Sequence, residues 1–208
     1  LTGVALFLIA IYVVVPLLLG LTGRKDFYYT LTSVALLSIA SAGVWLTFYI
    51  GRINMGQGAF ALMGAYVTAV LMMTYGWSFW WTIPAAGIFS ALASLLIGLP
   101  ILRLRGVYFA MVSLVLTEVT RLLALALPVT SGAKGITNIP LPGAMSIFGI
   151  TIVPDFATME NPRIAFYFLS ITLMVLAFAG MYRLVHSRIG HICMSLQQNE
   201  ELASSIGV

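Results

Sequence analysis

The chain has 208 residues, of which 61% are apolar and only 8% are charged, and its mean hydropathy is +1.07. Soluble domains carry about 25% charged residues, so this chain has too few charged side chains to cover the surface of a soluble fold. The formal net charge of +4 is spread along the chain, without a basic cluster of the size that nucleic acid binding uses. The composition therefore excludes a soluble domain and a nucleic-acid-binding protein, and it indicates a protein of the lipid bilayer.

Six apolar segments predict an all-α, polytopic membrane protein. A helix needs about 20 apolar residues to cross a bilayer, and these runs are too continuous for the alternating strands of a membrane barrel. We expect about six transmembrane helices, at residues 4–21, 28–50, 59–75, 82–102, 107–127 and 164–182. The chain starts at Leu1 inside an apolar run and stops at Val208, so we expect a single transmembrane domain over residues 1–208, truncated at both ends.

The connections between these segments differ in character. Residues 76–81 are aromatic and uncharged, which is typical of a lipid–water interface. The long connection at residues 128–163 is rich in glycine and proline, and we expect an ordered external loop that either docks a partner or only joins two helices. Basic residues are nearly balanced between the two sides of the membrane, with a weak excess on the side of the C-terminal tail.

A polar stretch at residues 51–60 separates the second apolar segment from the third. It carries the amides of Asn54 and Gln57, and Gly56 and Gly58 allow tight backbone turns. Unwound backbone at membrane depth must face protein or a water-filled cavity, and broken helices are a common way to build a transport site. Two interpretations stay open: these residues line a solute pathway, or the stretch is a plain cytoplasmic turn.

Glu118 and Arg121 lie in the fifth apolar segment, three residues apart, so they share a helical face. Ionisable groups at membrane depth are costly and usually pair or face the protein interior. The pair is either a polar contact in a translocation pathway or a salt bridge that locks the helix bundle. We favour the salt bridge, because each residue already has a partner.

The C-terminal tail, residues 186–208, predicts a short amphipathic helix in the aqueous phase. The apolar residues that fall near one helical face are Ile189, Ile192, Leu196, Ala203 and Ile206. Helices that lie on membranes usually carry Lys and Arg on the polar face. This tail carries Gln and Glu there, which favours a groove on a partner protein.

No catalytic constellation or metal-ligand spacing is present in the sequence. His186 and His191 are five residues apart and do not share a helical face well. Cys193 is the single cysteine and is interpreted as a packing residue. We therefore expect no enzymatic activity, no metal and no cofactor in this chain.

Four stretches, at residues 54–66, 102–123, 130–136 and 187–207, carry a likeness to a known family. They resemble, in order and over nearly the whole chain, the permease subunits of ABC importers for branched-chain amino acids, of the LivM type. The last stretch is similar to the coupling signature of importer permeases, with Leu202 where the usual triplet has an alanine. The ATPase-coupling residues that the resemblance implies are Arg188, Gly190, Asn199, Glu201, Ala203 and Gly207.

The resemblance also implies a setting and a set of partners. The tail would lie in the cytoplasm of a bacterium, below the cytoplasmic (inner) membrane, and further helices would follow Val208. Separate ABC ATPase subunits would hold ATP and Mg, a homologous second permease would complete the pathway, and an extracytoplasmic solute-binding protein would deliver the solute. The solute would be a branched-chain or related small amino acid, urea or a short amide. The alternative is a secondary transporter or channel for a small polar solute, which would have no use for the tail motif.

Overall fold

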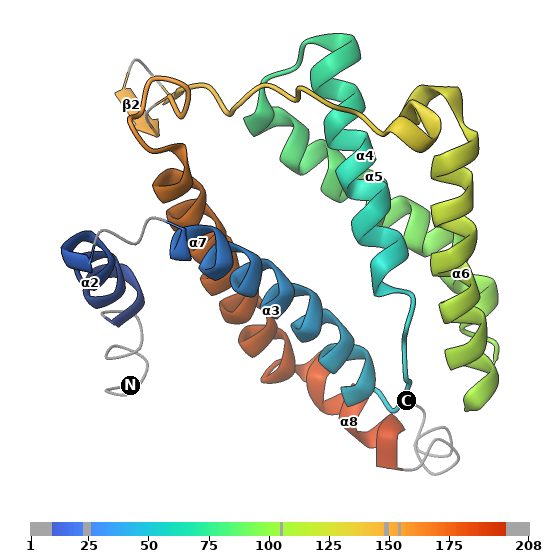
Figure 1. The fold of residues 1–208 in the computed structure, drawn as a ribbon. Coiled ribbons are helices and arrows are strands. Elements are labelled where there is room, and N and C mark those ends of the chain that lie inside the picture. The colour runs from blue at the N-terminus through green and yellow to red at the C-terminus, as the bar shows by residue number, and fades with distance from the viewer. Residues whose placement is uncertain (1–9, 23–25, 105, 148–149, 154, 199–208) are drawn as a thin grey trace.

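The computed structural model describes residues 10–22, 26–104, 106–147, 150–153 and 155–198. Helices dominate these residues, and the chain can be followed by its colour in Figure 1. In order, the elements are the π-helix η1 (Ala10–Val14), α2 (Val15–Thr22), α3 (Phe27–Tyr49), α4 (Gln57–Tyr75), α5 (Phe79–Ile101), α6 (Val107–Ala126), the 3-10 helices η2 (Pro128–Thr130) and η3 (Gly132–Lys134), the strands β1 (Met145–Ile147) and β2 (Ile150–Val153), α7 (Pro162–Val185) and α8 (Arg188–Gln198).

Five of the six predicted membrane segments are confirmed as helices that are long and apolar enough to cross a bilayer, namely α3 to α7. The first predicted segment begins outside the described residues, and its described part is a shorter apolar helix, Ala10–Leu21. The prediction of an all-α, polytopic membrane protein is therefore confirmed. The long connection between α6 and α7 adds a small antiparallel hairpin, in which Ser146 pairs with Thr151 and Ile147 with Ile150.

The long helices form two groups (Figure 1). In the first group α3 packs along α7, and in the second α4 packs against α5 and α6. The core of the first group consists of Tyr28, Ala35, Tyr167, Ile171 and Met174. The Tyr167 hydroxyl donates a hydrogen bond of 2.7 Å to the carbonyl oxygen of Ile11, which ties the N-terminal helices to α7.

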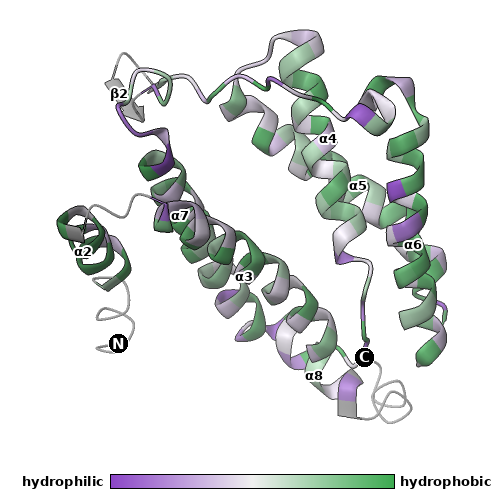
Figure 2. Cartoon of the chain, viewed as in Figure 1, coloured by the Kyte–Doolittle hydropathy of each residue, from purple (hydrophilic) through white to green (hydrophobic). Residues whose placement is uncertain are grey.

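The outward faces of the long helices are mostly apolar, as Figure 2 shows. Leu96 is 74% exposed and Trp81 is 72% exposed. Such faces suit lipid, because hydrocarbon covers apolar side chains without the free-energy penalty that water imposes. Hydrophilic residues gather near helix ends, in α8 and on α6.

Two sets of contacts join the groups at the end of the molecule that carries the long loop. Phe156, which is 1% exposed, makes edge-to-face ring contacts with Trp80 of α5 and Phe166 of α7, at centroid distances of 6.4 and 5.2 Å. The Trp80 indole N–H also donates to the carbonyl oxygen of Gly143 at 2.8 Å. At the opposite end of the molecule, the α3–α4 connection links the two groups covalently.

Candidate functional site

The α3–α4 connection, residues 50–56, begins with a tight turn at Gly51. Gly51 has a φ of +83°, in the left-handed region that glycine adopts without a steric penalty. Its amide N–H donates to the carbonyl oxygen of Phe48 at 2.8 Å, and the Arg52 N–H donates to that of Thr47 at 3.1 Å. These bonds satisfy the last carbonyls of α3 and end the helix.

Arg52 links this connection to the α5–α6 turn. Its Nη1 donates to the carbonyl oxygens of Leu102 at 2.7 Å and Leu104 at 2.8 Å. The guanidinium carbon lies 5.6 Å from the centre of the Phe109 ring. A cation at the C-terminal end of α5 is favourable because the helix dipole places partial negative charge there. The sequence signal for this contact is a lone arginine between two apolar segments.

The predicted polar residues Asn54 and Gly56 lie together at the start of α4. Asn54 Oδ1 accepts a hydrogen bond of 2.7 Å from the amide N–H of Gly56. The Met55 amide N–H donates to Ser113 Oγ at 3.0 Å, and Thr117 Oγ1 donates to the Met55 carbonyl oxygen at 3.2 Å. The Ser113 and Thr117 hydroxyls of α6 therefore bind both the backbone N–H and the backbone carbonyl group of Met55. Ser113, a buried hydroxyl within an apolar helix, was not among the predicted site residues.

The small residues at this point let the helices approach closely. A Cβ on Gly56 would lie 3.1 Å from the Ser113 carbonyl oxygen, and one on Gly58 would lie 3.1 Å from Thr117 Cγ2. A Cβ on Gly43 of α3 would overlap the side-chain amide of Gln57. Gln57 thus reaches from α4 across to α3, between the two helix groups.

The stretch at residues 51–60 is a connection between two separate helices that continues into α4 at Gln57. Within it, Asn54 uses its carbonyl group for a local turn, and Gln57 projects toward α3. A pathway role for these residues stays a prediction.

Glu118 and Arg121 form the predicted salt bridge, with Arg121 Nη2 at 2.6 Å from Glu118 Oε1 and Nε at 2.9 Å from Oε2. The two side chains are 57% and 54% exposed. Both bonds lie within α6, and the pair makes no ion pair or hydrogen bond to a second helix within the described residues. Its role, in the bundle or in a pathway, stays a prediction. The packed side of α6 is formed instead by Phe109, Ser113, Thr120 and Ala124.

The tail begins with a sharp turn from α7 into α8. Gly190 is buried, and a Cβ there would overlap the carbonyl group of Val185, so only glycine fits. The α8 helix is confirmed over Arg188–Gln198. Two apolar side chains on it are open, with Ile189 62% and Ile192 43% exposed. Arg188 is exposed as well.

Four of the predicted coupling residues, Asn199, Glu201, Ala203 and Gly207, lie outside the described residues. No group of three or more His, Cys, Asp or Glu side chains that could hold a metal occurs in the part of the chain that the structure describes.

The α8 helix rests on the end of α3, as Figure 1 shows. Gln197 Nε2 donates to the carbonyl oxygen of Phe48 at 3.4 Å. A Cβ on Gly51 would lie 3.3 Å from Gln197 Cα. The tail helix thus contacts the same connection that Arg52 ties to α5 and that Ser113 ties to α6, which the sequence did not predict.

Comparison with known proteins identifies relatives. Residues 27–208 match the family described as permease component of the branched-chain amino acid transport system. The high-affinity branched-chain amino acid transport system permease proteins LivM of Salmonella typhimurium strain LT2 and of Escherichia coli K12 are each 34% identical to it over 174 residues. Each match covers 76% of this chain and 40% of the relative, so the chain spans about 40% of the length of these relatives. No solved structure matches the chain.

Proposed function

We propose that this chain, which belongs to the family of permease components of branched-chain amino acid transport systems, forms part of the solute pathway of an ABC importer. The solute is a branched-chain amino acid or a related small solute, and the multi-pass chain lies in the bacterial cytoplasmic membrane. The observation that carries the proposal is the placement of α8, an amphipathic helix seated on the end of α3 with its isoleucines exposed.

Separate ATPase subunits supply the energy, and they hold ATP and Mg. The exposed Ile189 and Ile192 suit an apolar groove on such a partner, because two aliphatic side chains on one helical face bury well in it. The segment 199–208, with Glu201, Ala203 and Gly207, continues the docking surface in this proposal.

Motion of α8 has two routes into the membrane helices. The close approach of Gly190 to Val185 joins α8 tightly to α7, so that α7 moves with it. The contact with Gly51 passes the motion to the α3–α4 connection, and Arg52 passes it on to the α5–α6 turn. ATP drives this change only if it binds the outward and inward states of the transporter with different affinity.

The solute pathway runs beside Asn54, Gly56, Gln57 and Gly58 in this proposal, and a homologous second permease completes it. The exposed Glu118–Arg121 pair supports a neighbour on that face of α6, because an ion pair at membrane depth is costly unless protein or water surrounds it. An extracytoplasmic solute-binding protein delivers the solute to the external loop.

The test uses the complete transporter in proteoliposomes, with Cys193 replaced by serine and single cysteines introduced on α8. Ile189→Cys and Ile192→Cys are expected to crosslink to the ATPase subunit, and His191→Cys, which is exposed on a different face of α8, is expected to crosslink weakly. Leucine uptake should require ATP. Uptake that continues without ATP, with no crosslink at either isoleucine position, would favour an ion-driven transporter or channel and reject the proposal.

A further inference from the structure

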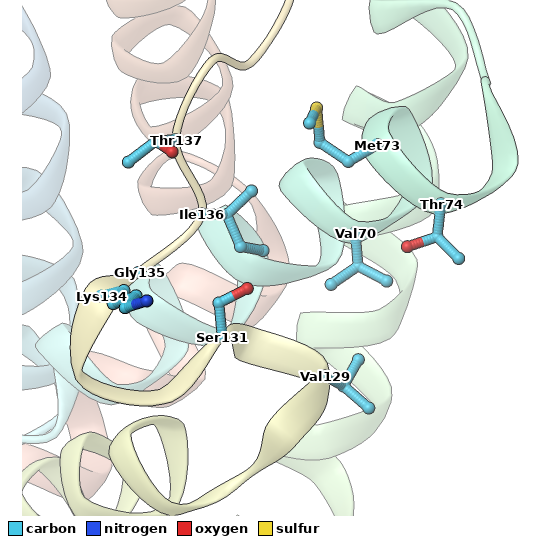
Figure 3. Close-up of a pocket in the computed structure, with 9 residues that line it drawn as sticks. All are labelled: Val70, Met73, Thr74, Val129, Ser131, Lys134, Gly135, Ile136 and Thr137. Atoms are coloured by element: carbon cyan, nitrogen blue, oxygen red, sulfur yellow. The ribbon is translucent and has the colours of Figure 1, made fainter.

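A pocket of about 310 Å³ opens between the end of α4 and the start of the long external loop (Figure 3). The pocket lies at the Tyr75 end of α4. The α3–α4 connection and α8 lie at the other end of α4, near Gln57. The lining residues are Val70, Met73 and Thr74 of α4 and Val129, Ser131 and 134–137 of the loop. The volume is at the lower end of the range for small-molecule sites, so the pocket suits a small ligand.

The lining combines an apolar wall with one cation. Val70, Met73, Val129 and Ile136 supply aliphatic and thioether surface. Among the described residues that line the pocket, Lys134 is the only charged one. The ion pairs of the described residues are Glu118–Arg121 and Asp26–Arg163, so the Lys134 ammonium has no carboxylate partner among them.

The loop that carries Lys134 is held in place by contacts with α6. The buried Thr130 hydroxyl lies within hydrogen-bond distance of the carbonyl oxygens of Ala124 and Leu127, which share its single proton. A Cβ on Gly132 would lie 3.1 Å from the Leu125 carbonyl oxygen, which shows how closely the turn lies on α6. The pocket is therefore formed without a ligand, which lowers the entropic cost of binding.

We propose that this pocket is an outer binding site for a small aliphatic carboxylate, of which a branched-chain amino acid is one. Lys134 pairs with the carboxylate, and the aliphatic side chain lies against Val70, Met73 and Val129. The hydroxyls of Thr74, Ser131 and Thr137 are available to accept hydrogen bonds from an amino group. The described residues that line the pocket include no acidic one, so they offer a cationic solute no counter-ion. The outer location rests on the proposed function.

The experiment places a reporter in the pocket of the complete transporter in intact cells. Thr137 is exposed and lines the pocket. A membrane-impermeant maleimide should therefore label the Thr137→Cys variant from outside. Leucine and 4-methyl-2-oxopentanoate, which both carry the carboxylate, should protect the cysteine from labelling. Leucinamide, which lacks the carboxylate, should not. Ala133→Cys, exposed in the same loop but outside the pocket, should be labelled equally with and without leucine.

Charge variants at Lys134 complete the test. With Thr137→Cys as reporter, Lys134→Gln should raise the half-protecting leucine concentration by about tenfold, because one charge-assisted hydrogen bond is lost. Lys134→Arg keeps the cation and should retain protection. Equal protection by leucine and leucinamide, or no effect of Lys134→Gln, would overturn the proposal.

Uptake measured in the same cells separates this site from the proposed function. If ATP-dependent leucine uptake proceeds while leucine leaves Thr137→Cys unprotected, the pocket assignment fails and the importer proposal stands. If protection holds and no ATP-dependent uptake occurs, the importer proposal fails and the pocket assignment stands.

Discussion

Gly190 occupies a position where no side chain fits, because a Cβ would overlap the carbonyl group of Val185. Gly190→Ala should therefore force the α7–α8 turn to open and should destabilise the protein by about 1–3 kcal/mol. Gly180→Ala is the matched control, since a Cβ at Gly180 in α7 meets nothing within 4 Å. That change should be neutral or stabilising, as alanine favours a helix over glycine. Thermal unfolding in detergent, followed by circular dichroism, checks both. Equal melting temperatures would contradict the close contact at Gly190.

Arg52 holds two carbonyl oxygens at the end of α5 through one nitrogen. Arg52→Gln should cost about 1–2 kcal/mol of stability, because a charge-assisted hydrogen bond pair is lost at a half-buried site. Arg103→Gln removes the same charge from the same end of the molecule, but Arg103 is exposed and has no polar side-chain partner among the described residues. It should leave the unfolding midpoint unchanged. Comparable losses in the two variants would assign the effect to membrane topology and not to the Arg52 bonds.

The elements were predictable where a local pattern decides them. The five long helices follow from runs of apolar residues that match the thickness of a bilayer, a requirement that each segment meets alone. The presence of a helix in the tail followed from its amphipathic pattern, and the structure describes this helix over Arg188–Gln198. The bonds of Arg52 to Leu102 and of Ser113 to Met55 were not predictable, because they depend on which helices become neighbours in space. The hairpin at 145–153 was missed because it consists of short strands within a loop.

The contact of α8 with the α3–α4 connection gives a prediction for a whole element. Gly51→Ala and Gly76→Ala both place a side chain at positive φ, at +83° and +64°. Each should cost roughly 1–2 kcal/mol from backbone strain. Only Gly51→Ala also presses on α8, since a Cβ there would lie 3.3 Å from Gln197 Cα, and a Cβ at Gly76 meets nothing within 4 Å.

Amide hydrogen exchange over residues 188–198 distinguishes these two variants. Exchange in α8 should be faster in Gly51→Ala than in Gly76→Ala, because only the former disturbs the surface on which α8 rests. If α8 exchanges at the same rate in both, the helix is held by α7 alone, and the route from the tail to the α3–α4 connection is absent.

At the scale of the whole molecule, Phe156 joins the two helix groups at the end opposite α8. Its buried ring contacts Trp80 of one group and Phe166 of the other. Removing a buried aromatic ring lowers the free energy of unfolding by about 3–5 kcal/mol. Phe156→Ala should therefore strongly weaken the contact between Trp80 and Phe166 through this ring. The groups would then be held mainly by the α3–α4 connection and by α8, and their separation at the loop end should vary more. Trp81→Ala is the control, because Trp81 is 72% exposed on the adjacent position of α5.

Spin labels on exposed positions of the two groups measure this separation. Ile88 on α5 and Leu176 on α7 are each 63% exposed, so labels on Ile88→Cys and Leu176→Cys should not disturb packing. With Cys193 replaced by serine, electron-spin distance measurements should give a broader distribution in Phe156→Ala than in Trp81→Ala. Equal widths in the two variants would mean that lipid and neighbouring subunits, and not the aromatic contacts, fix the angle between the groups.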